Sequence, residues 1–115
     1  MENELLHTIL KEFGARPNMR IWRNNTGSAY GVSLIQRAKQ AGYIPDNLPI
    51  TKYGIKGMAD IFGIIAPNGR HISIECKSDK GKQTPEQRIW QQMVESMGGV
   101  YILARSLKDV SEVFS

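Results

Sequence analysis

The sequence predicts an α/β domain with a central mixed β-sheet flanked by helices. Apolar residues recur at helical spacing in residues 2–13 and 85–97. Short apolar runs typical of strands occupy residues 19–23 and 100–104, and they also lie on both sides of residues 67–69. With 115 residues, the chain has room for one domain with one hydrophobic core.

Composition limits the possible functions. The chain has 15 Lys and Arg against 11 Asp and Glu, a formal net charge of +4, which suits a nucleic-acid partner without establishing one. The single cysteine excludes an internal disulfide. No apolar run approaches the roughly twenty residues of a membrane span, and the acidic N-terminus lacks a signal-peptide pattern. We therefore expect a cytoplasmic protein with no membrane partner.

Residues 2–13 are the first expected helix, and Gly14 is placed to end it. Glu2 falls within the apolar arc of this helix, whereas Glu4 falls on the opposite side. Two interpretations of Glu2 remain open. It is a first-turn carboxylate favoured by the helix dipole, or its side chain points inward over the strands that follow.

The next segments are a strand at residues 19–23, a polar turn at 24–28 and a short helix at 32–42. Two prolines then predict irregular structure, with a poorly defined strand around residues 48–55. We expect a single domain over residues 1–115 with a possible insertion at about 32–50.

The stretch from residue 57 to 77 predicts a β-hairpin around Asn-Gly at 68–69. A two-residue turn there pairs Asp60 with Lys77 and Phe62 with Glu75. Alternation along the strands then places Asp60, Glu75 and Lys77 on one face. The opposite, core-facing side carries Ile61, Ile65, Ile72, Ile74 and Cys76.

Two carboxylates and an ammonium group on one face of an apolar hairpin are costly to bury without a counter-ion. A divalent cation held between Asp60 and Glu75 would remove that cost. Hard cations such as Mg²⁺ and Mn²⁺ prefer oxygen ligands, so these carboxylates are the candidate metal ligands.

After the hairpin, Thr84-Pro85-Glu86-Gln87 predicts a helix start with a capping box. The buried stripe of this helix is expected to contain Trp90, Met93, Val94 and Met97. A buried strand follows at residues 100–104, and Ser106 is expected to cap a final helix.

Three motifs together carry a family resemblance: Lys56-Gly57-Met58-Ala59-Asp60, Glu75-Cys76-Lys77, and Thr84-Pro85-Glu86-Gln87. They resemble the VRR-NUC (virus-type replication-repair nuclease) family of the PD-(D/E)xK superfamily, in particular a stand-alone phage-type member. The family often has proline where this chain has Ala59. The resemblance implies a restriction-endonuclease-like αβββαβ core and a metal-dependent DNA endonuclease activity, similar to that of a Holliday junction resolvase. A phage-encoded member would act in the host cell cytoplasm.

The resemblance also implies roles for individual residues. Mg²⁺ or Mn²⁺ would be held by the side chains of Asp60 and Glu75 and by the Cys76 carbonyl. Lys77 would orient the attacking water, and Gln87 would position that water or the metal shell. The inward interpretation of Glu2 agrees with the additional acid that the superfamily often supplies from its first helix. Basic residues in loops bordering the motif are the expected DNA contacts: Lys56, Lys80 and Lys82.

Several alternatives remain open. One is a catalytically silent DNA-binding module that retains the fold. Another is an α/β domain in which Asp60 and Glu75 make ordinary ion pairs with Lys77. The family resemblance also implies a branched or four-way-junction substrate. A homodimer is expected because cutting two strands with one site needs two rounds or two copies. The segment at 32–50 and a terminal helix ending in Val113 and Phe114 favour a dimer, unless they cover the monomer's own sheet.

Overall fold

The chain divides into two compact units. One comprises Met1–Asn24 and Lys56–Ser115, and the other comprises Asn25–Ile55. The predicted insertion at 32–50 therefore lies inside the second unit. The computed structural model describes residues 2–24, 27–28, 32–47, 52–53 and 55–114.

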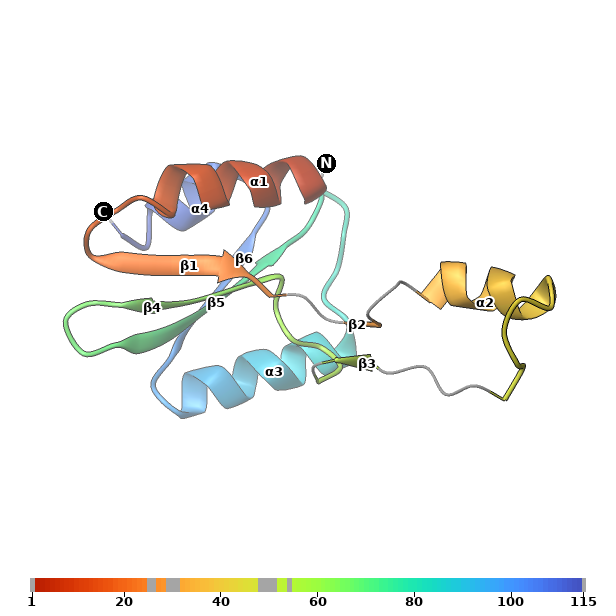
Figure 1. Cartoon of the computed structure of the whole chain (residues 1–115). Helices are drawn as coiled ribbons and strands as arrows, with labels where there is room; N and C mark the ends of the chain where they lie inside the picture. Colours follow the sequence, from red (N-terminus) through yellow and green to blue (C-terminus); the bar gives the residue numbers. More distant parts are fainter. Residues whose placement is uncertain (1, 25–26, 29–31, 48–51, 54, 115) are drawn as a thin grey trace. The chain divides into compact units, whose positions relative to one another are not determined.

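The first unit is a mixed α/β structure. In chain order it contains α1 (Glu2–Phe13), β1 (Met19–Arg23), β4 (Ile61–Ile65), β5 (Arg70–Cys76), α3 (Pro85–Ser96), β6 (Val100–Ala104) and α4 (Leu107–Ser111). The sheet order is β1-β4-β5-β6. The pairs β1–β4 and β4–β5 are antiparallel and β5–β6 is parallel, so the predicted mixed sheet is confirmed. Helices α1 and α4 cover one face of the sheet and α3 covers the other (Figure 1).

The face of the sheet under α1 and α4 carries the main hydrophobic core. As the alternation of the sequence predicts, Ile61, Ile72, Ile74 and Cys76 are buried on this face. They pack against the apolar side of α1, which supplies Leu6, Ile9 and Phe13. The carboxylate-bearing face is therefore the one turned toward α3.

The hairpin has the predicted alternation but a different register. Phe62 pairs with Ser73 and Ile65 with Arg70, which moves every pair by two residues from the predicted one. The connecting loop is residues 66–69, and its Ala66–Pro67 bond is cis. The predicted two-residue turn would place Pro67 in a ladder pair, but proline has no N–H to donate there. Because the shift is an even number of residues, each side chain keeps its predicted face.

Helix α3 begins with the predicted capping box. The Gln87 N–H donates to Thr84 Oγ1 at 3.1 Å, and the Thr84 N–H donates to Gln87 Oε1 at 2.9 Å. Val94 is buried, as predicted, whereas Trp90 and Met93 are only half-buried. The prediction for Met97 is wrong, because this residue caps the C-terminal end of the helix and is 80% exposed.

Helix α4 and the residues after it pack on the first unit's own core. Val110 is fully buried, and the rings of Phe13 and Phe114 lie 6.1 Å apart. Phe114 therefore covers the core of its own chain, which is the alternative to a role in a dimer interface. Val113 remains 49% exposed.

The second unit contains β2 (Gly27–Ser28), α2 (Val32–Gln40) and β3 (Lys52–Tyr53). The two short strands form an antiparallel sheet of their own, so the strand expected around 48–55 does not join the four-stranded sheet. Residues 48–51 and 54 of that prediction, and residues 25–26 of the predicted polar turn, lie outside the described residues. No helix in the described part of the chain is long and apolar enough to span a membrane.

Candidate active site

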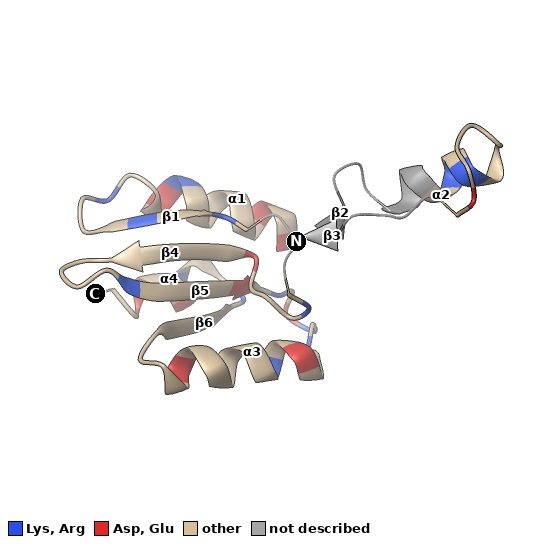
Figure 2. Cartoon of the chain, turned by 60° about the horizontal axis from the view of Figure 1, so that its bottom comes forward, with Lys and Arg blue, Asp and Glu red and all other residues tan. Residues whose placement is uncertain are grey.

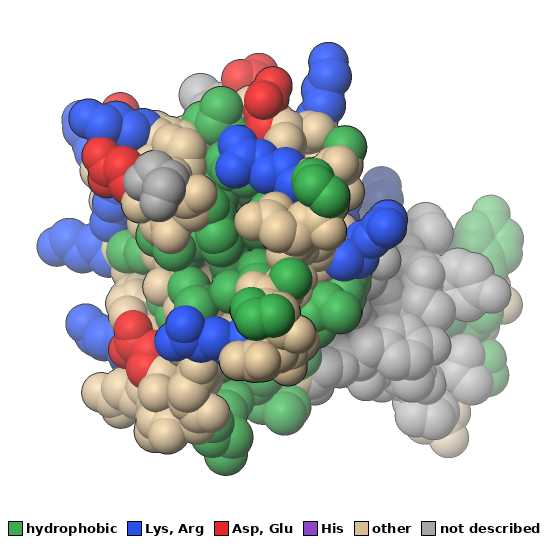
Figure 3. All heavy atoms as spheres, turned by 90° about the vertical axis from the view of Figure 1, so that its left-hand side faces the viewer, with side chains coloured by type: hydrophobic (Ala, Val, Ile, Leu, Met, Phe, Trp, Pro, Cys, Tyr) green, Lys and Arg blue, Asp and Glu red, His purple; other side chains and the backbone are tan. Residues whose placement is uncertain are grey.

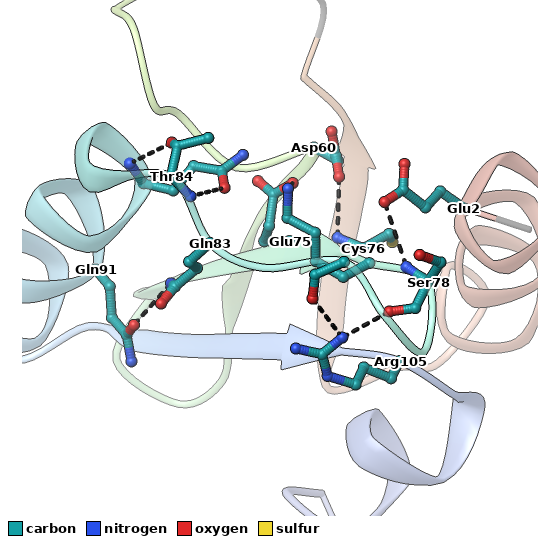
Figure 4. Close-up of polar contacts among 12 residues, drawn as sticks. Glu2, Asp60, Glu75, Cys76, Ser78, Gln83, Thr84, Gln91 and Arg105 are labelled. Carbon is teal, nitrogen blue, oxygen red and sulfur yellow. Dashed lines mark hydrogen bonds and ion pairs between the residues drawn. The ribbon is translucent and has the colours of Figure 1, made fainter.

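Acidic residues from separate elements meet at one end of the sheet. Asp60 directly precedes β4, Glu75 lies next to the last residue of β5, and Glu2 is the first residue of α1. Figure 2 shows acidic positions in red at this end of α1, β4 and β5, and Figure 4 shows the side chains of Asp60, Glu75 and Glu2 close together. The charges of Asp60 and Glu2 both raise the pKa of Glu75.

Asp60 is held from both sides by its neighbouring strands. Its Oδ2 accepts a hydrogen bond from the Cys76 N–H at 2.9 Å. Its backbone carbonyl accepts from the Asn24 N–H at 2.8 Å, and Asn24 Nδ2 donates to the Ala59 carbonyl at 3.1 Å. The carboxylate is therefore fixed next to the end of β5 rather than free to rotate into solvent.

Glu75 is a buried carboxyl group with an unsatisfied oxygen. The residue is only 3% exposed, and its Oε1 has no hydrogen-bond partner among the residues that the structure describes. Desolvation by burial raises the pKa of Glu75 to about 8, and the charge of Asp60 and a hydrogen bond with its carboxyl add to this shift. Without a cation, Glu75 therefore keeps its proton at neutral pH.

Lys77 supplies the nearest positive charge. Its Nζ lies 4.0 Å from Glu75 Oε2, and its side chain is 14% exposed. This charge lowers the pKa of Glu75 but does not overcome desolvation, which is the larger effect. The backbone N–H of Lys77 donates to the Ala104 carbonyl at 2.9 Å, so the parallel strand β6 fixes where Lys77 leaves the sheet.

The structure agrees with the inward interpretation of Glu2, because its side chain points toward the end of the hairpin. Glu2 Oε1 accepts a hydrogen bond from the Ser78 N–H at 3.3 Å (Figure 4). The charge of Glu2 contributes to the raised pKa of both Glu75 and Cys76. Glu2 is exposed, so it lies at the rim of the site rather than inside it.

Arg105 holds the loop that follows Lys77. Its Nη1 donates to the carbonyls of Ser78 at 2.6 Å and Gly81 at 2.7 Å, and more weakly to that of Asp79 at 3.4 Å (Figure 4). Several carbonyl oxygens converging on one guanidinium nitrogen fix the loop's curvature. The loop in turn presents the Ser78 N–H to Glu2.

Gln87 has its carboxamide oxygen in the helix cap rather than on the carboxylates. A different glutamine, Gln83, forms a polar network beside Glu75. Its Nε2 donates to Gln91 Oε1 at 2.8 Å and to the Tyr101 hydroxyl at 3.1 Å. Burial raises the pKa of Tyr101 to about 12, so this phenol stays protonated and is a neutral hydrogen-bonding group.

The lysines expected to contact DNA differ in their surroundings. Lys56 Nζ lies 3.8 Å from Glu86 Oε1, and the Lys56 side chain is 85% exposed. Lys80 and Lys82 are exposed. Lys80 lines a cavity of about 580 Å³ together with Lys77 and Arg105. Basic side chains also lie on the end of the molecule with the α1–β1 and β4–β5 loops, among hydrophobic ones (Figure 3). Net charge therefore does not locate a DNA-binding surface.

The residues present fit a hard divalent cation. Glu75 Oε1 is a buried oxygen that no described residue hydrogen-bonds, and it lies next to a second carboxylate. A cation would relieve both conditions. Burial raises the pKa of the Cys76 thiol to about 12, so its side chain belongs to the core and only its backbone is a candidate ligand. The described residues contain no group of three or more His, Cys, Asp or Glu side chains placed to hold a metal.

Sequence reasoning did not identify the hydrogen bonds by which Asn24, Ser78 and Arg105 hold the site together. For Arg105 a signal was present, because it directly follows the strand that runs parallel to β5. Parallel neighbours end at the same edge of a sheet, which places Arg105 beside the residues after Lys77. No protein-family model matches the chain, and no curated protein or solved structure matches it either.

Proposed function

We propose that this chain is a metal-dependent DNA endonuclease. The observation that carries the proposal is the buried Oε1 of Glu75 beside Asp60, which has no hydrogen-bond partner in the described part of the chain. Lys77 Nζ lies 4.0 Å from the same carboxyl group. A structural ion pair would leave neither an orphan oxygen nor a carboxyl group with its pKa raised to about 8. Perturbed carboxyl groups next to a lysine are typical of sites that perform chemistry.

The arrangement of the first unit supports a restriction-endonuclease-like assignment. Its element order is one helix, three strands, one helix and one strand, followed by α4. Asp60 lies at the start of the second strand and Glu75 near the end of the third. This agrees with the αβββαβ core and with the order of motifs in the VRR-NUC family that the sequence resembles.

In the proposed reaction, Asp60, Glu75 and the Cys76 carbonyl would hold Mg²⁺ or Mn²⁺. When bound, such a cation neutralises phosphoryl charge and lowers the pKa of a bound water. Lys77 would orient the attacking water and neutralise charge developing in the transition state, because its ammonium group only donates hydrogen bonds. Glu2 and Gln87 would position water at the rim. Lys56, Lys80 and Lys82 would contact phosphates of the DNA.

A cleavage assay on a four-way junction and on a linear duplex of the same sequence tests the proposal. We expect cutting with Mg²⁺ or Mn²⁺, preference for the junction, and none with EDTA. Asp60→Asn and Lys77→Met should each reduce the cleavage rate at least about a hundredfold, as losses of electrostatic stabilisation do. Lys108→Met, which removes a 79% exposed lysine on α4, is the matched control and should cut normally.

The outcomes separate the alternatives. DNA binding without cleavage by the unmodified protein would identify a catalytically silent module. Full cleavage by Lys77→Met or Asp60→Asn would remove the proposed site. Neither binding nor cleavage would leave an α/β domain whose carboxylates have another role.

We also propose a homodimer as the form that cuts both strands of a junction. Phe114 packs on its own chain, so the proposal rests on the second unit, Asn25–Ile55, as the candidate dimer contact. Light scattering at micromolar concentration should give about twice the chain mass of 12.9 kDa. A monomeric mass while junction cutting is retained would separate the activity from dimerisation.

A further inference from the structure

The four-stranded sheet places its side chains in rows across the strands, and one row next to the carboxylates is partly uncovered. Trp22 of β1 pairs with Phe62 of β4, which pairs with Ser73 of β5. Ser73 is two residues from Glu75, so its side chain lies on the same face. Trp22 therefore lies on the carboxylate-bearing face, about 7 Å along the strands from the row that contains Glu75.

Helix α3 fills only part of this face. The rings of Trp90 and Phe62 stack with centroids 5.6 Å apart at an interplanar angle of 7°. Trp90 Nε1 also donates to the hydroxyl of the buried Ser73 at 3.1 Å, which anchors α3 over β4 and β5. Beyond this stack, Trp22 is 47% exposed and Ile64 is 48% exposed.

The chemistry of this open surface indicates its partner. Arg20 lies on the same face as Trp22, two residues along β1, and is exposed opposite Ile64. An indole that presents its ring to solvent between a guanidinium group and a candidate cation site has the features that bind a strand of nucleic acid. The ring stacks on a base, and the guanidinium group beside it takes a phosphate. A protein partner would be expected to need a larger apolar surface and would gain nothing from the carboxylates.

We propose that Trp22 is a stacking platform for an unpaired base of the DNA substrate. The inference rests on the proposed nuclease function and deepens it by specifying the substrate, a strand with at least one base exposed next to the cleaved phosphate. Bases inside an intact duplex are stacked on one another and cannot reach the ring. Branched DNA, frayed ends and single strands supply such bases.

Fluorescence tests this directly, because the chain has two tryptophans. Trp90→Phe keeps an aromatic ring on Phe62 and leaves Trp22 as the sole tryptophan. This protein is titrated in EDTA with a short oligothymidylate, with an abasic strand of equal length and charge, and with a duplex. We expect oligothymidylate to quench Trp22 emission strongly, and the abasic strand and the duplex to do so weakly.

The affinity of the otherwise unmodified protein provides the second measurement. Trp22→Ala should weaken oligothymidylate binding about 5- to 150-fold, the range expected for losing one stacked base. Trp22→Phe should recover most of the loss, and abasic-strand binding should be the same in all three proteins. Ile89→Ala, which removes an apolar side chain on α3 that is 65% exposed, is the matched control. Circular dichroism checks that each variant is folded.

Several results would overturn the inference. These are equal oligothymidylate affinity for Trp22→Ala and the unmodified protein, equal quenching by the abasic strand, or burial of Trp22 that rises with protein concentration in the absence of DNA. The last result would identify a second copy of the chain as the occupant. Absence of cleavage with Mn²⁺, together with Trp22-dependent binding, would contradict the nuclease function and leave the stacking surface standing. Cleavage with Mn²⁺, together with oligothymidylate binding that does not depend on Trp22, would contradict the stacking surface and leave the nuclease function standing.

Discussion

The backbone N–H of Cys76 donates a 2.9 Å hydrogen bond to Oδ2 of Asp60, so this carboxylate satisfies a main-chain donor at the end of β5 as well as facing Glu75. The bond joins the start of β4 to the end of β5 beyond their last ladder pair, Ile61 with Ile74. Asp60 therefore contributes to stability as well as to the proposed chemistry.

This relationship predicts different outcomes for two substitutions of Asp60. Asp60→Ala leaves the Cys76 N–H unsatisfied and should lower the free energy of unfolding by about 1–3 kcal/mol. Asp60→Asn keeps an acceptor oxygen and should lower it by less than about 1 kcal/mol, while both variants lose cleavage. Urea unfolding measures the difference. Equal stabilities for the two variants would show that the hydrogen bond adds nothing.

Glu75 predicts how the metal-free protein responds to pH. Its pKa is raised from 4.5 to about 8 in the folded state, so the folded protein retains a proton that the unfolded chain releases. The stability that this proton contributes is complete below about pH 4.5 and is lost as pH rises to about 8. The slope for one group is at most about 1.4 kcal/mol per pH unit. Excess Mg²⁺ should oppose the decline.

Thermal unfolding in EDTA from pH 4.5 to 9 measures this effect. Glu75→Gln, which has no proton to release, is the matched variant, and its stability should vary less over this range. If the two proteins keep the same pH dependence, the decline comes from other groups.

Lys77→Met should raise the pH at which the folded protein loses the stability contributed by the Glu75 proton. The Lys77 charge lowers the pKa of Glu75, whereas desolvation and the charges of Asp60 and Glu2 raise it. Removing the Lys77 charge should therefore raise this pKa further. The midpoint is expected above pH 8. Lys108→Met, made on the exposed surface of α4, should leave the midpoint unchanged. The measurement is the same unfolding series in EDTA, and a midpoint that falls would contradict the assigned contact.

Arg105→Lys should loosen the loop at residues 78–81. A lysine cannot reproduce the hydrogen bonds from one guanidinium nitrogen to Ser78 and Gly81, although it keeps the charge. We expect amide hydrogen exchange in the loop to rise about tenfold and global stability to fall by about 1–2 kcal/mol. Arg88→Lys, on the exposed surface of α3, is the control. Unchanged exchange in the loop would show that Arg105 does not hold it.

Gln87 can be tested apart from its cap. Thr84→Ala and Gln87→Ala each break the capping box and should destabilise the protein by about 1 kcal/mol. Gln87→Glu retains the capping geometry, since glutamate serves equally in a capping box. If Gln87 acts at the site as proposed, cleavage falls in Gln87→Ala and stays near normal in Thr84→Ala. Equal rates in these two variants would restrict Gln87 to capping.

Local patterns alone determined most elements of the first unit. The predicted bounds of α1 (Glu2–Phe13), β1 (Met19–Arg23) and β6 (Val100–Ala104), and the capping box of α3, agree with the structure. Each depends on residues close in sequence: a helical apolar arc, a short apolar run, or a side chain that reaches three residues along the chain. The face on which Glu75 lies was likewise predictable, because strand alternation survives an even shift of register.

Only the tertiary structure decided the contacts that make the candidate site. The register of the hairpin depends on where β4 ends, which is at Ile65 rather than at Pro67. Three features depend on how two or more elements pack together. These are the direction of the Glu2 side chain, the hydrogen bonds from Arg105 and the exposure of Trp22. Sequence patterns record the periodicity of one segment at a time, whereas burial and hydrogen-bond partners between distant segments follow from how the sheet and its helices assemble.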